Sequence, residues 1–229
     1  MAKRTIILHY HLFKNAGTSV DRILQGNFPD RWVTAEFRGQ NNTAQVIDWI
    51  RDTPDAVAFS SHTMMGPIPK LPNVDIIPVM LLRDPVARIR SAYRFEHAQQ
   101  SDNFGAVLAR HTDLEGYVRV RLALPGDRQC RNFQTWRLAS LMPGPGAELD
   151  RATEALKLFT VVGRVENFSP AMARLQDAVH LIAPKFKFTK VHANKTKPNR
   201  TDDDPSFVDM LKEINKDDLK LLETVAKSS

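Results

Sequence analysis

A lysine stands just before a turn of small residues near the start of the chain. Lys14 is followed by Asn, Ala and Gly and then by Thr18 and Ser19, in the stretch HLFKNAGTSV. A turn of small residues between a strand and a helix leaves backbone N–H groups pointing outward, and the helix N-terminus adds partial positive charge. A lysine nearby meets an anionic oxygen as a mobile point charge. The stretch therefore predicts either a phosphate or sulfate site or a merely structural turn.

A second candidate anion site lies in the stretch LLRDPVARIRSAYRF, residues 81–95. Arg83 falls at the carboxyl end of an expected strand, where open α/β sheets bind their ligands. Ser91 follows on the expected helix, and Arg88, three residues before it, shares its face. Arg83 could instead pair with Asp84 as a structural contact. Two anion sites at the ends of two strands indicate a ligand with phosphates at two places.

Strand-like and helix-like stretches alternate along the chain and position these residues. The expected strands are RTIILHYHL, AVAFSS, DIIPVMLLR and LKLFTVVGRVENF. The expected helices are GTSVDRILQG, TAQVIDWIRD, VARIRSAYRFEHA, SPAMARLQDAVHLIA and KDDLKLLETVAK. Asp84 and Ser169 are predicted N-caps, each followed by a proline at the first helical position. The alternation predicts an α/β fold with a mostly parallel central sheet flanked by helices.

The length and composition fit one globular domain over residues 1–229, because 42% of the residues are hydrophobic and 25% are charged. Residues 102–147 have a helical pattern broken by PGDRQ and MPGPG, and they are predicted to form a helical insertion over one end of the sheet. The stretch KFKFTKVHANKTKPNRTDDDP has little periodicity and is expected to be a long surface loop.

The charge and cysteine usage restrict the class of partner and the compartment. A formal charge of +6 and a pI near 9.5 favour anionic partners such as nucleotides, nucleic acid, acidic lipids or acidic sugars. Cys130 is the only cysteine, which excludes an internal disulfide and favours a reducing cytoplasm. The N-terminal apolar run is too short for a signal peptide, and no stretch approaches a membrane span. No histidine or carboxylate spacing argues for a metal.

The two motifs together resemble those of the sulfotransferases that use 3′-phosphoadenosine 5′-phosphosulfate (PAPS). HLFKNAGTSV is similar to their 5′-phosphosulfate loop, and LLRDPVARIRSAYRF is similar to their 3′-phosphate motif, an Arg-Asp-Pro turn with a serine eight residues after the arginine. SSHTMMG, RNFQTWRLAS, VVGRVENF and HANKTKPNR extend the resemblance over most of the chain. The branch it resembles contains heparan sulfate 2-O-sulfotransferase and bacterial carbohydrate-type sulfotransferases. Phe13 stands where a proline commonly precedes the lysine.

The resemblance implies a P-loop-NTPase-like sulfotransferase fold. It also implies transfer of the sulfuryl group from PAPS to a hydroxyl of a carbohydrate or glycoconjugate, with 3′-phosphoadenosine 5′-phosphate (PAP) as product and no metal. Lys14 would then stabilise the bridging oxygen of the leaving group. The residues implied to bind the donor nucleotide are Lys14, Asn15, Ala16, Gly17, Thr18, Ser19, Arg83, Ser91, Lys195 and Thr196.

His62, in SSHTMMG, corresponds in the resemblance to the family's catalytic base, and its unperturbed pKa suits that role near neutral pH. His9 and His11 alternate with Tyr10 on the first expected strand, so both point to one face. That face either lines the pocket or packs in the core.

Three alternatives to a sulfotransferase remain. A nucleotide kinase would place the lysine after the second glycine and add an acidic residue for Mg²⁺, whereas here Lys14 precedes Gly17 by three residues. A nucleic-acid-binding protein would account for the charge, but no recognition helix, zinc finger or ribonucleoprotein signature is present. A non-catalytic PAP- or PAPS-binding protein would share both motifs.

Overall fold

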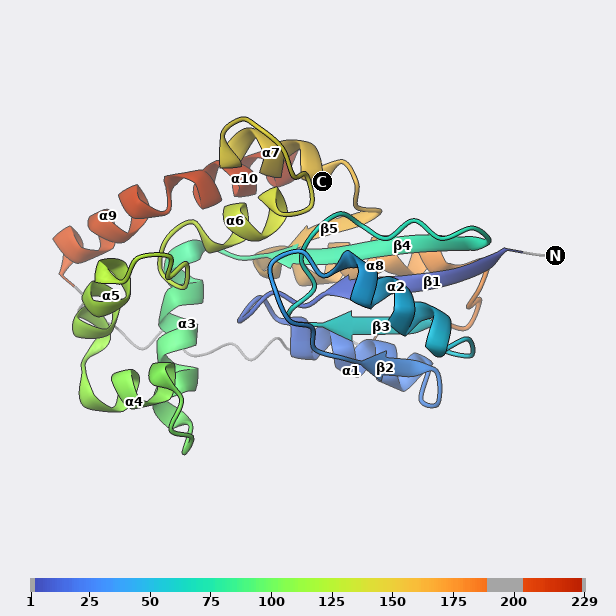
Figure 1. Cartoon of the computed structure of the whole chain (residues 1–229), viewed down its shortest axis with the longest axis horizontal. Coiled ribbons are helices and arrows are strands. Elements are labelled where there is room, and N and C mark those ends of the chain that lie inside the picture. Colours follow the sequence, from blue (N-terminus) through green and yellow to red (C-terminus); the bar gives the residue numbers. More distant parts are fainter. Residues whose placement is uncertain (1–2, 189–203, 228–229) are drawn as a thin grey trace.

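The central element of the fold is a five-stranded parallel sheet (Figure 1). The structure is a computed structural model that describes residues 3–188 and 204–227. The strands are β1 (Arg4–Tyr10), β2 (Trp32–Thr34), β3 (Ala58–Ser61), β4 (Val74–Leu82) and β5 (Val161–Arg164). Their order is β2-β3-β1-β4-β5, and every neighbouring pair is parallel. The predicted α/β class is confirmed, and the arrangement is consistent with a P-loop-like fold.

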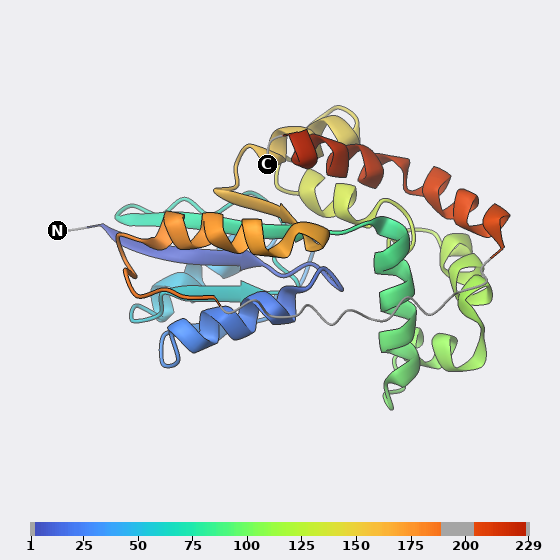
Figure 2. The ribbon, with the colours of Figure 1, turned by 180° about the vertical axis from the view of Figure 1, so that it is seen from behind.

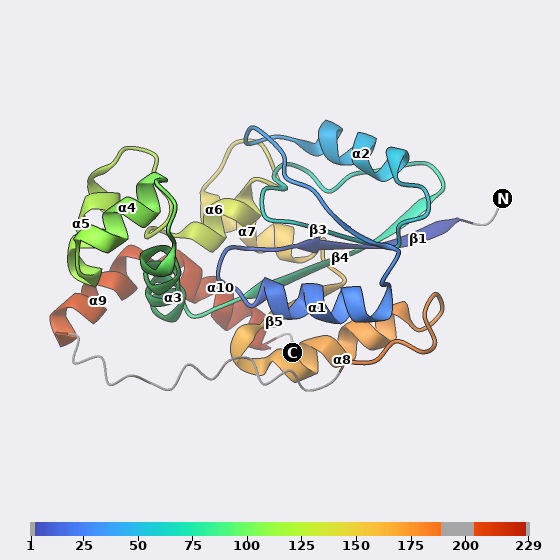
Figure 3. The ribbon, with the colours of Figure 1, turned by 90° about the horizontal axis from the view of Figure 1, so that it is seen from below.

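Both faces of the sheet are buried, as expected for parallel strands. In β1 and β4, alternate residues such as Ile6 and Met80 belong to one core, and their neighbours Ile7 and Val79 belong to the other. The second face is covered by α1 (Gly17–Asn27) and α8 (Phe168–Val179), as Figures 2 and 3 show. The first face is covered by α2 (Thr43–Asp52), α6 (Phe133–Ala139), α7 (Glu148–Leu156) and α10 (Lys216–Lys227).

A third hydrophobic core lies beyond the carboxyl ends of the strands (Figure 1). It is formed by α3 (Pro85–Ala98), α4 (Phe104–His111), α5 (Leu114–Ala123) and α9 (Pro205–Ile214). Buried Arg121 joins α5 to α3 and to the loop after α5, because its guanidinium donates to Glu96 and Asp127, each at 2.8 Å. Within residues 102–147, α4 and α5 therefore pack against α3 and α9, whereas α6 packs on the sheet.

Of the two predicted helix N-caps that precede a proline, one is confirmed and the other is wrong. Asp84 accepts a hydrogen bond from the backbone N–H of Ala87 at 2.8 Å, which confirms its prediction as the N-cap of α3. The predicted cap at Ser169 is wrong. A 3₁₀ turn, Val165–Asn167, leads directly into α8, and Asn167 is the N-cap of that helix. The sequence patterns also did not predict β2, α7 or α9.

The C-terminal helix caps α6. The residue before α6, Asn132, has a left-handed backbone and makes no capping bond with its side chain. Asp218 of α10 replaces it by accepting from the backbone N–H groups of Gln134 and Thr135, at 3.2 and 2.8 Å, and from the Thr135 hydroxyl at 2.7 Å. Burial raises the pKa of Asp218, which is fully enclosed. None of the helices in the described ranges has the length and apolar composition needed to cross a membrane.

Asp218→Ala removes the acceptor of two buried backbone N–H groups. We expect the free energy of unfolding to fall by about 2–4 kcal/mol, because two buried donors that lose their acceptor keep their full desolvation penalty. Urea denaturation followed by circular dichroism measures the change. Asp209→Ala, on the exposed side of α9, is the matched control and should leave the midpoint unchanged. Equal midpoints for the two variants would contradict the capping role.

Candidate functional site

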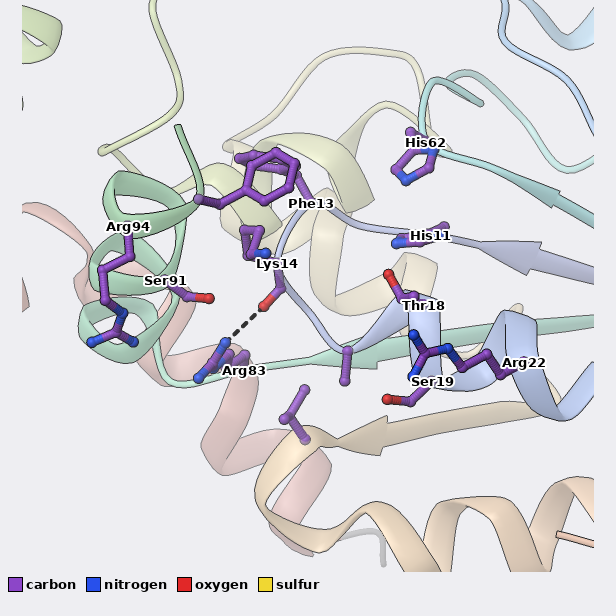
Figure 4. A pocket seen from close by; sticks show the side chains of 14 residues that line it. His11, Phe13, Lys14, Thr18, Ser19, Arg22, His62, Arg83, Ser91 and Arg94 are labelled. Atoms are coloured by element: carbon purple, nitrogen blue, oxygen red, sulfur yellow. Dashed lines mark hydrogen bonds between the residues drawn. The ribbon is translucent and has the colours of Figure 1, made fainter. Parts of the chain in front are cut away.

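A cavity of about 500 Å³ lies at the carboxyl ends of β1, β3 and β4 (Figure 4). Its walls come from the loop between β1 and α1, the start of α1, the ends of β3 and β4, and α3. It is lined by His11, Phe13, Lys14, Ala16, Gly17, Thr18, Ser19, Arg22, His62, Arg83, Ser91, Arg94, Phe95 and Val165. The structure therefore brings the two predicted anion motifs and His62 to a single cavity.

The loop before α1 presents backbone donors to this cavity. Lys14 and Ala16 have φ values of 65° and 59°, in the left-handed region that non-glycine residues seldom adopt. The Ser19 N–H donates to the carbonyl of Ala16 at 2.9 Å. The N–H groups of Ala16, Gly17 and Thr18 donate to no other residue within the described ranges. These free donors at a helix N-terminus suit an anionic oxygen.

Lys14 and Arg83 come from neighbouring strand ends and are joined directly. The Arg83 guanidinium donates to the backbone carbonyl of Lys14 at 3.0 Å, the contact drawn in Figure 4. The Lys14 ammonium lies 4.2 Å from the ring centroid of Phe95. Burial, and then the charges of Arg83 and Arg94, lower the pKa of Lys14. A bound anion would relieve this repulsion, which makes the pair a candidate binding site.

Asn15 has a different role from the one the resemblance implied. Its backbone N–H donates to the Leu12 carbonyl at 3.1 Å, so it is not available to a phosphate, and its side chain is buried. The side-chain amide donates to the Leu81 carbonyl at 2.8 Å and to Gln134 at 2.7 Å. Asn15 therefore fixes the loop from behind instead of lining the cavity.

Gln134 connects the two anion motifs. Its side-chain oxygen accepts from Asn15 and from the backbone N–H of Arg83, the latter at 2.8 Å. Its side-chain nitrogen donates to the Arg83 carbonyl at 2.8 Å and to Asp218 at 3.3 Å. Because Gln134 is fully buried and its amide is fully engaged, it sets the position of the Lys14 loop relative to the end of β4.

His62 is paired with a carboxylate. Its Nδ1 lies 2.7 Å from an oxygen of Glu36, which precedes α2 in the chain, and its side chain is about half exposed. Burial acts to raise the pKa of Glu36, but hydrogen bonds from Thr63 and His62 outweigh it and lower that pKa. An ionised Glu36 accepts from Nδ1–H and leaves Nε2 of His62 as a proton acceptor. Buried Arg137 donates to the His62 carbonyl at 2.9 Å and holds this segment in place.

His9 and His11 both contact Asp21 of α1. The two Nδ1 atoms lie 2.9 and 2.8 Å from different oxygens of the Asp21 carboxylate. Burial acts to raise the pKa of Asp21, but hydrogen bonds from His11 and His9 outweigh it and hold the pKa well below its usual range. These three residues could also hold a metal ion, since their ligand atoms lie within 4.8 Å of one another. His11 lines the cavity, whereas His9 is enclosed in the core.

Two further predicted residues, Lys195 and Thr196, lie outside the described residues. Arg88 is fully buried, donates to the Gln129 carbonyl and stacks 4.6 Å from the Phe133 ring, so it does not line the cavity.

Other site residues were missed by sequence reasoning. Glu36 occurs in a segment without a recognisable motif. Asp21 directly follows HLFKNAGTSV and Gln134 lies in RNFQTWRLAS, but neither stretch indicates a role for them, and only the folded arrangement brings all three to the site. Arg22 had a usable signal, because it follows Thr18 by four residues on α1 and so shares its face.

The fold and the cavity define an α/β protein with a cationic pocket at the carboxyl ends of a parallel sheet. The chain is 38% identical, over 244 aligned positions, to a protein of Archaeoglobus fulgidus described as an uncharacterized protein. The alignment covers 97% of this chain and 96% of the relative, so the chain belongs to the same family as this archaeal protein. No family model matches the chain.

Gly17→Ala tests the packing of the loop against His11. A Cβ atom at Gly17 would lie 2.0 Å from Cδ2 of His11, so the imidazole or the helix start must move. We expect the free energy of unfolding to fall by about 1–3 kcal/mol, as overpacking does elsewhere. Gly26→Ala is the control in the same helix, because a Cβ there meets nothing within 4 Å and alanine favours helix. If both variants unfold at the same urea concentration, His11 does not pack against Gly17.

Proposed function

We propose that the protein is a sulfotransferase that moves the sulfuryl group of PAPS to a hydroxyl acceptor. The observation that carries the proposal is the single cavity lined by both the Lys14 loop and the Arg83–Ser91 pair. A nucleotide with phosphates at its 5′ and 3′ positions needs two anion sites a fixed distance apart. The bridging amide of Gln134 provides that fixed separation.

In this proposal the Lys14 loop binds the 5′ end of the donor. The N–H groups of Ala16, Gly17 and Thr18, with the hydroxyls of Thr18 and Ser19, donate to the phosphate oxygens. Lys14 faces the bridging oxygen, where negative charge develops as PAP leaves. Arg83 and Ser91 bind the 3′-phosphate, which a guanidinium and a hydroxyl recognise with charge-assisted hydrogen bonds.

The reaction is an in-line displacement at sulfur. The acceptor oxygen forms a bond to sulfur while the bond from sulfur to the 5′-phosphate oxygen breaks, and the electron pair of that bond leaves with PAP. The acceptor proton passes to Nε2 of His62, whose Nδ1–H is held by Glu36. Glu36 therefore acts as a positioning residue for the base, in the way that a carboxylate orients a catalytic histidine elsewhere.

We propose a carbohydrate or glycoconjugate as the acceptor and the cytoplasm as the compartment. The acceptor class rests on the resemblance to carbohydrate-type sulfotransferases, and the compartment rests on the single cysteine. The charges lining the cavity within the described residues are all basic, from Lys14, Arg22, Arg83 and Arg94, and they match the several negative charges of PAPS.

The nucleotide site is tested by calorimetric binding of PAP, 5′-AMP and ADP. We expect PAP to bind about tenfold or more tightly than either, because each charge-assisted hydrogen bond to the extra phosphate contributes about 1.5–3 kcal/mol. Arg83→Ala should remove this preference. Arg51→Ala, an exposed arginine on α2, is the control and should keep it. Equal affinity for PAP and 5′-AMP would refute the two-phosphate site, and preference for ADP would favour a nucleotide kinase.

The base is tested by transfer from labelled PAPS to a panel of hydroxylated carbohydrates. We expect His62→Ala to lower kcat by about 10²- to 10⁴-fold, the usual contribution of a general base, with PAP affinity unchanged. Glu36→Gln should lower kcat less, because the amide still accepts from Nδ1–H. His180→Ala, at an exposed histidine after α8, is the control. Full activity in His62→Ala would show that another group takes the proton, although the enzyme class would stand.

A further inference from the structure

Two histidine–carboxylate pairs meet at the cavity. The ring centroids of His11 and His62 are 3.8 Å apart, with an angle of 35° between the ring planes. Figure 4 shows the His62 ring above the His11 ring, with Thr18 below His11. They come from different strand ends. Nδ1 of His11 contacts the carboxylate of Asp21, and Nδ1 of His62 contacts the carboxylate of Glu36.

Asp21 determines which nitrogen of His11 is free. The two oxygens of its carboxylate contact different histidines: Oδ1 contacts His9 and Oδ2 contacts His11. A carboxylate only accepts hydrogen bonds, so both Nδ1 atoms carry a hydrogen, and in the neutral form of each imidazole the lone pair is then on Nε2. Among the described residues, Asp21 is the one hydrogen-bond partner of a His11 ring nitrogen.

The His11 ring lies between the phosphate loop and His62. On one side it packs so closely against Gly17 that a Cβ atom there would be 2.3 Å from Nε2. On the other side it contacts the His62 ring. An imidazole in this position adjoins both the loop that would bind the 5′-phosphate and the base that would receive the acceptor proton.

We propose that His11, oriented by Asp21, is a second proton acceptor of this site alongside His62. The inference rests on the proposed sulfuryl transfer. When the acceptor O–H bond breaks, its proton goes to Nε2 of either imidazole, and the electron pair stays on the oxygen that bonds to sulfur. His62 is about half exposed and returns its proton to solvent readily, whereas His11 is 6% exposed and serves an acceptor seated deeper, against the loop.

His9 provides a matched control for His11. Both contact Asp21 through Nδ1 at nearly the same distance, and both lie on β1, but only His11 lines the cavity. Substitution by asparagine keeps an N–H donor for Asp21 and removes Nε2. The surroundings differ, because His9 Nδ1 also lies 3.1 Å from the Ser60 hydroxyl whereas the His11 ring contacts His62. A purely structural role of His11, through the position of His62, predicts no further loss of kcat when His11→Asn is added to His62→Ala. A proton-accepting role predicts an effect on kcat at His11 alone.

The experiment compares His9→Asn and His11→Asn, each alone and combined with His62→Ala. We expect His11→Asn to lower kcat about tenfold or more, and to remove most of the activity left in His62→Ala, within the range of general base catalysis. His9→Asn should change kcat less than about twofold, as a residue outside the cavity. Calorimetric PAP affinity and the melting temperature, measured for every variant, should agree between the two asparagine variants. Equal kcat for the two asparagine variants would overturn the inference.

Two measurements on the wild-type protein need no sulfuryl transfer and so separate this inference from the proposed function. Ring ¹⁵N chemical shifts should show His11 with its hydrogen on Nδ1 and a bare Nε2, and the opposite tautomer would overturn the inference. Metal analysis of the purified protein should find no stoichiometric zinc. If the wild-type protein contains one zinc per chain and His11→Asn removes that zinc, then His9, His11 and Asp21 bind a metal. That result would also overturn the inference. If the wild-type protein shows the expected tautomer but neither binds PAP nor transfers the sulfuryl group, the proposed function is refuted and the orientation of His11 stands.

Discussion

One buried amide joins the two strand ends that carry the anion motifs of the pocket. Gln134 accepts from Asn15 and from the backbone of Arg83, and it donates back to Arg83 and to Asp218. Each of these groups belongs to a different part of the chain, and a buried amide that loses any partner keeps a desolvated polar atom. The network therefore stabilises one arrangement of the two strand ends. Because Asp218 also caps α6, the C-terminal helix contributes to a site built mainly from the first hundred residues.

The same logic governs the two histidines that reach the cavity. An imidazole has two possible neutral tautomers, and a carboxylate on Nδ1 selects the one with a bare Nε2. Asp21 and Glu36 both have lowered pKa values, so both remain charged and able to make this selection near neutral pH. Asp21 belongs to α1, the helix whose first turn offers free N–H groups. One helix thus orients a histidine and presents the free N–H groups of the proposed anion site.

The sequence predicts the parts of this site that depend on local order. A strand, a small-residue loop and a helix follow directly from HLFKNAGTSV, and Asp84 with Pro85 marks the start of α3. Side chains that act across the fold are not predictable in this way. The side chains of Gln134 and Asn15 are hydrogen-bonded although 119 positions separate them in the sequence, and those of Glu36 and His62 although 26 positions separate them. Neither pair lies within one motif. Strand β2 was not predicted for the same reason, because it has only three residues and is defined by its pairing with β3.

The pocket holds more positive charge and backbone strain than a structural turn would need. Lys14 and Ala16 keep left-handed backbones, and such conformations persist only where the surroundings determine them, at about 1–3 kcal/mol each. Lys14 also lies close enough to Arg83 and Arg94 for their charges to lower its pKa. The Gln134 network and the hydrophobic cores supply the stability that this arrangement lacks on its own. A ligand with several negative charges would remove the repulsion, so the folded state should gain stability on binding it. Under the proposed function, the unfavourable local energy at the strand ends is preorganisation for the anionic donor.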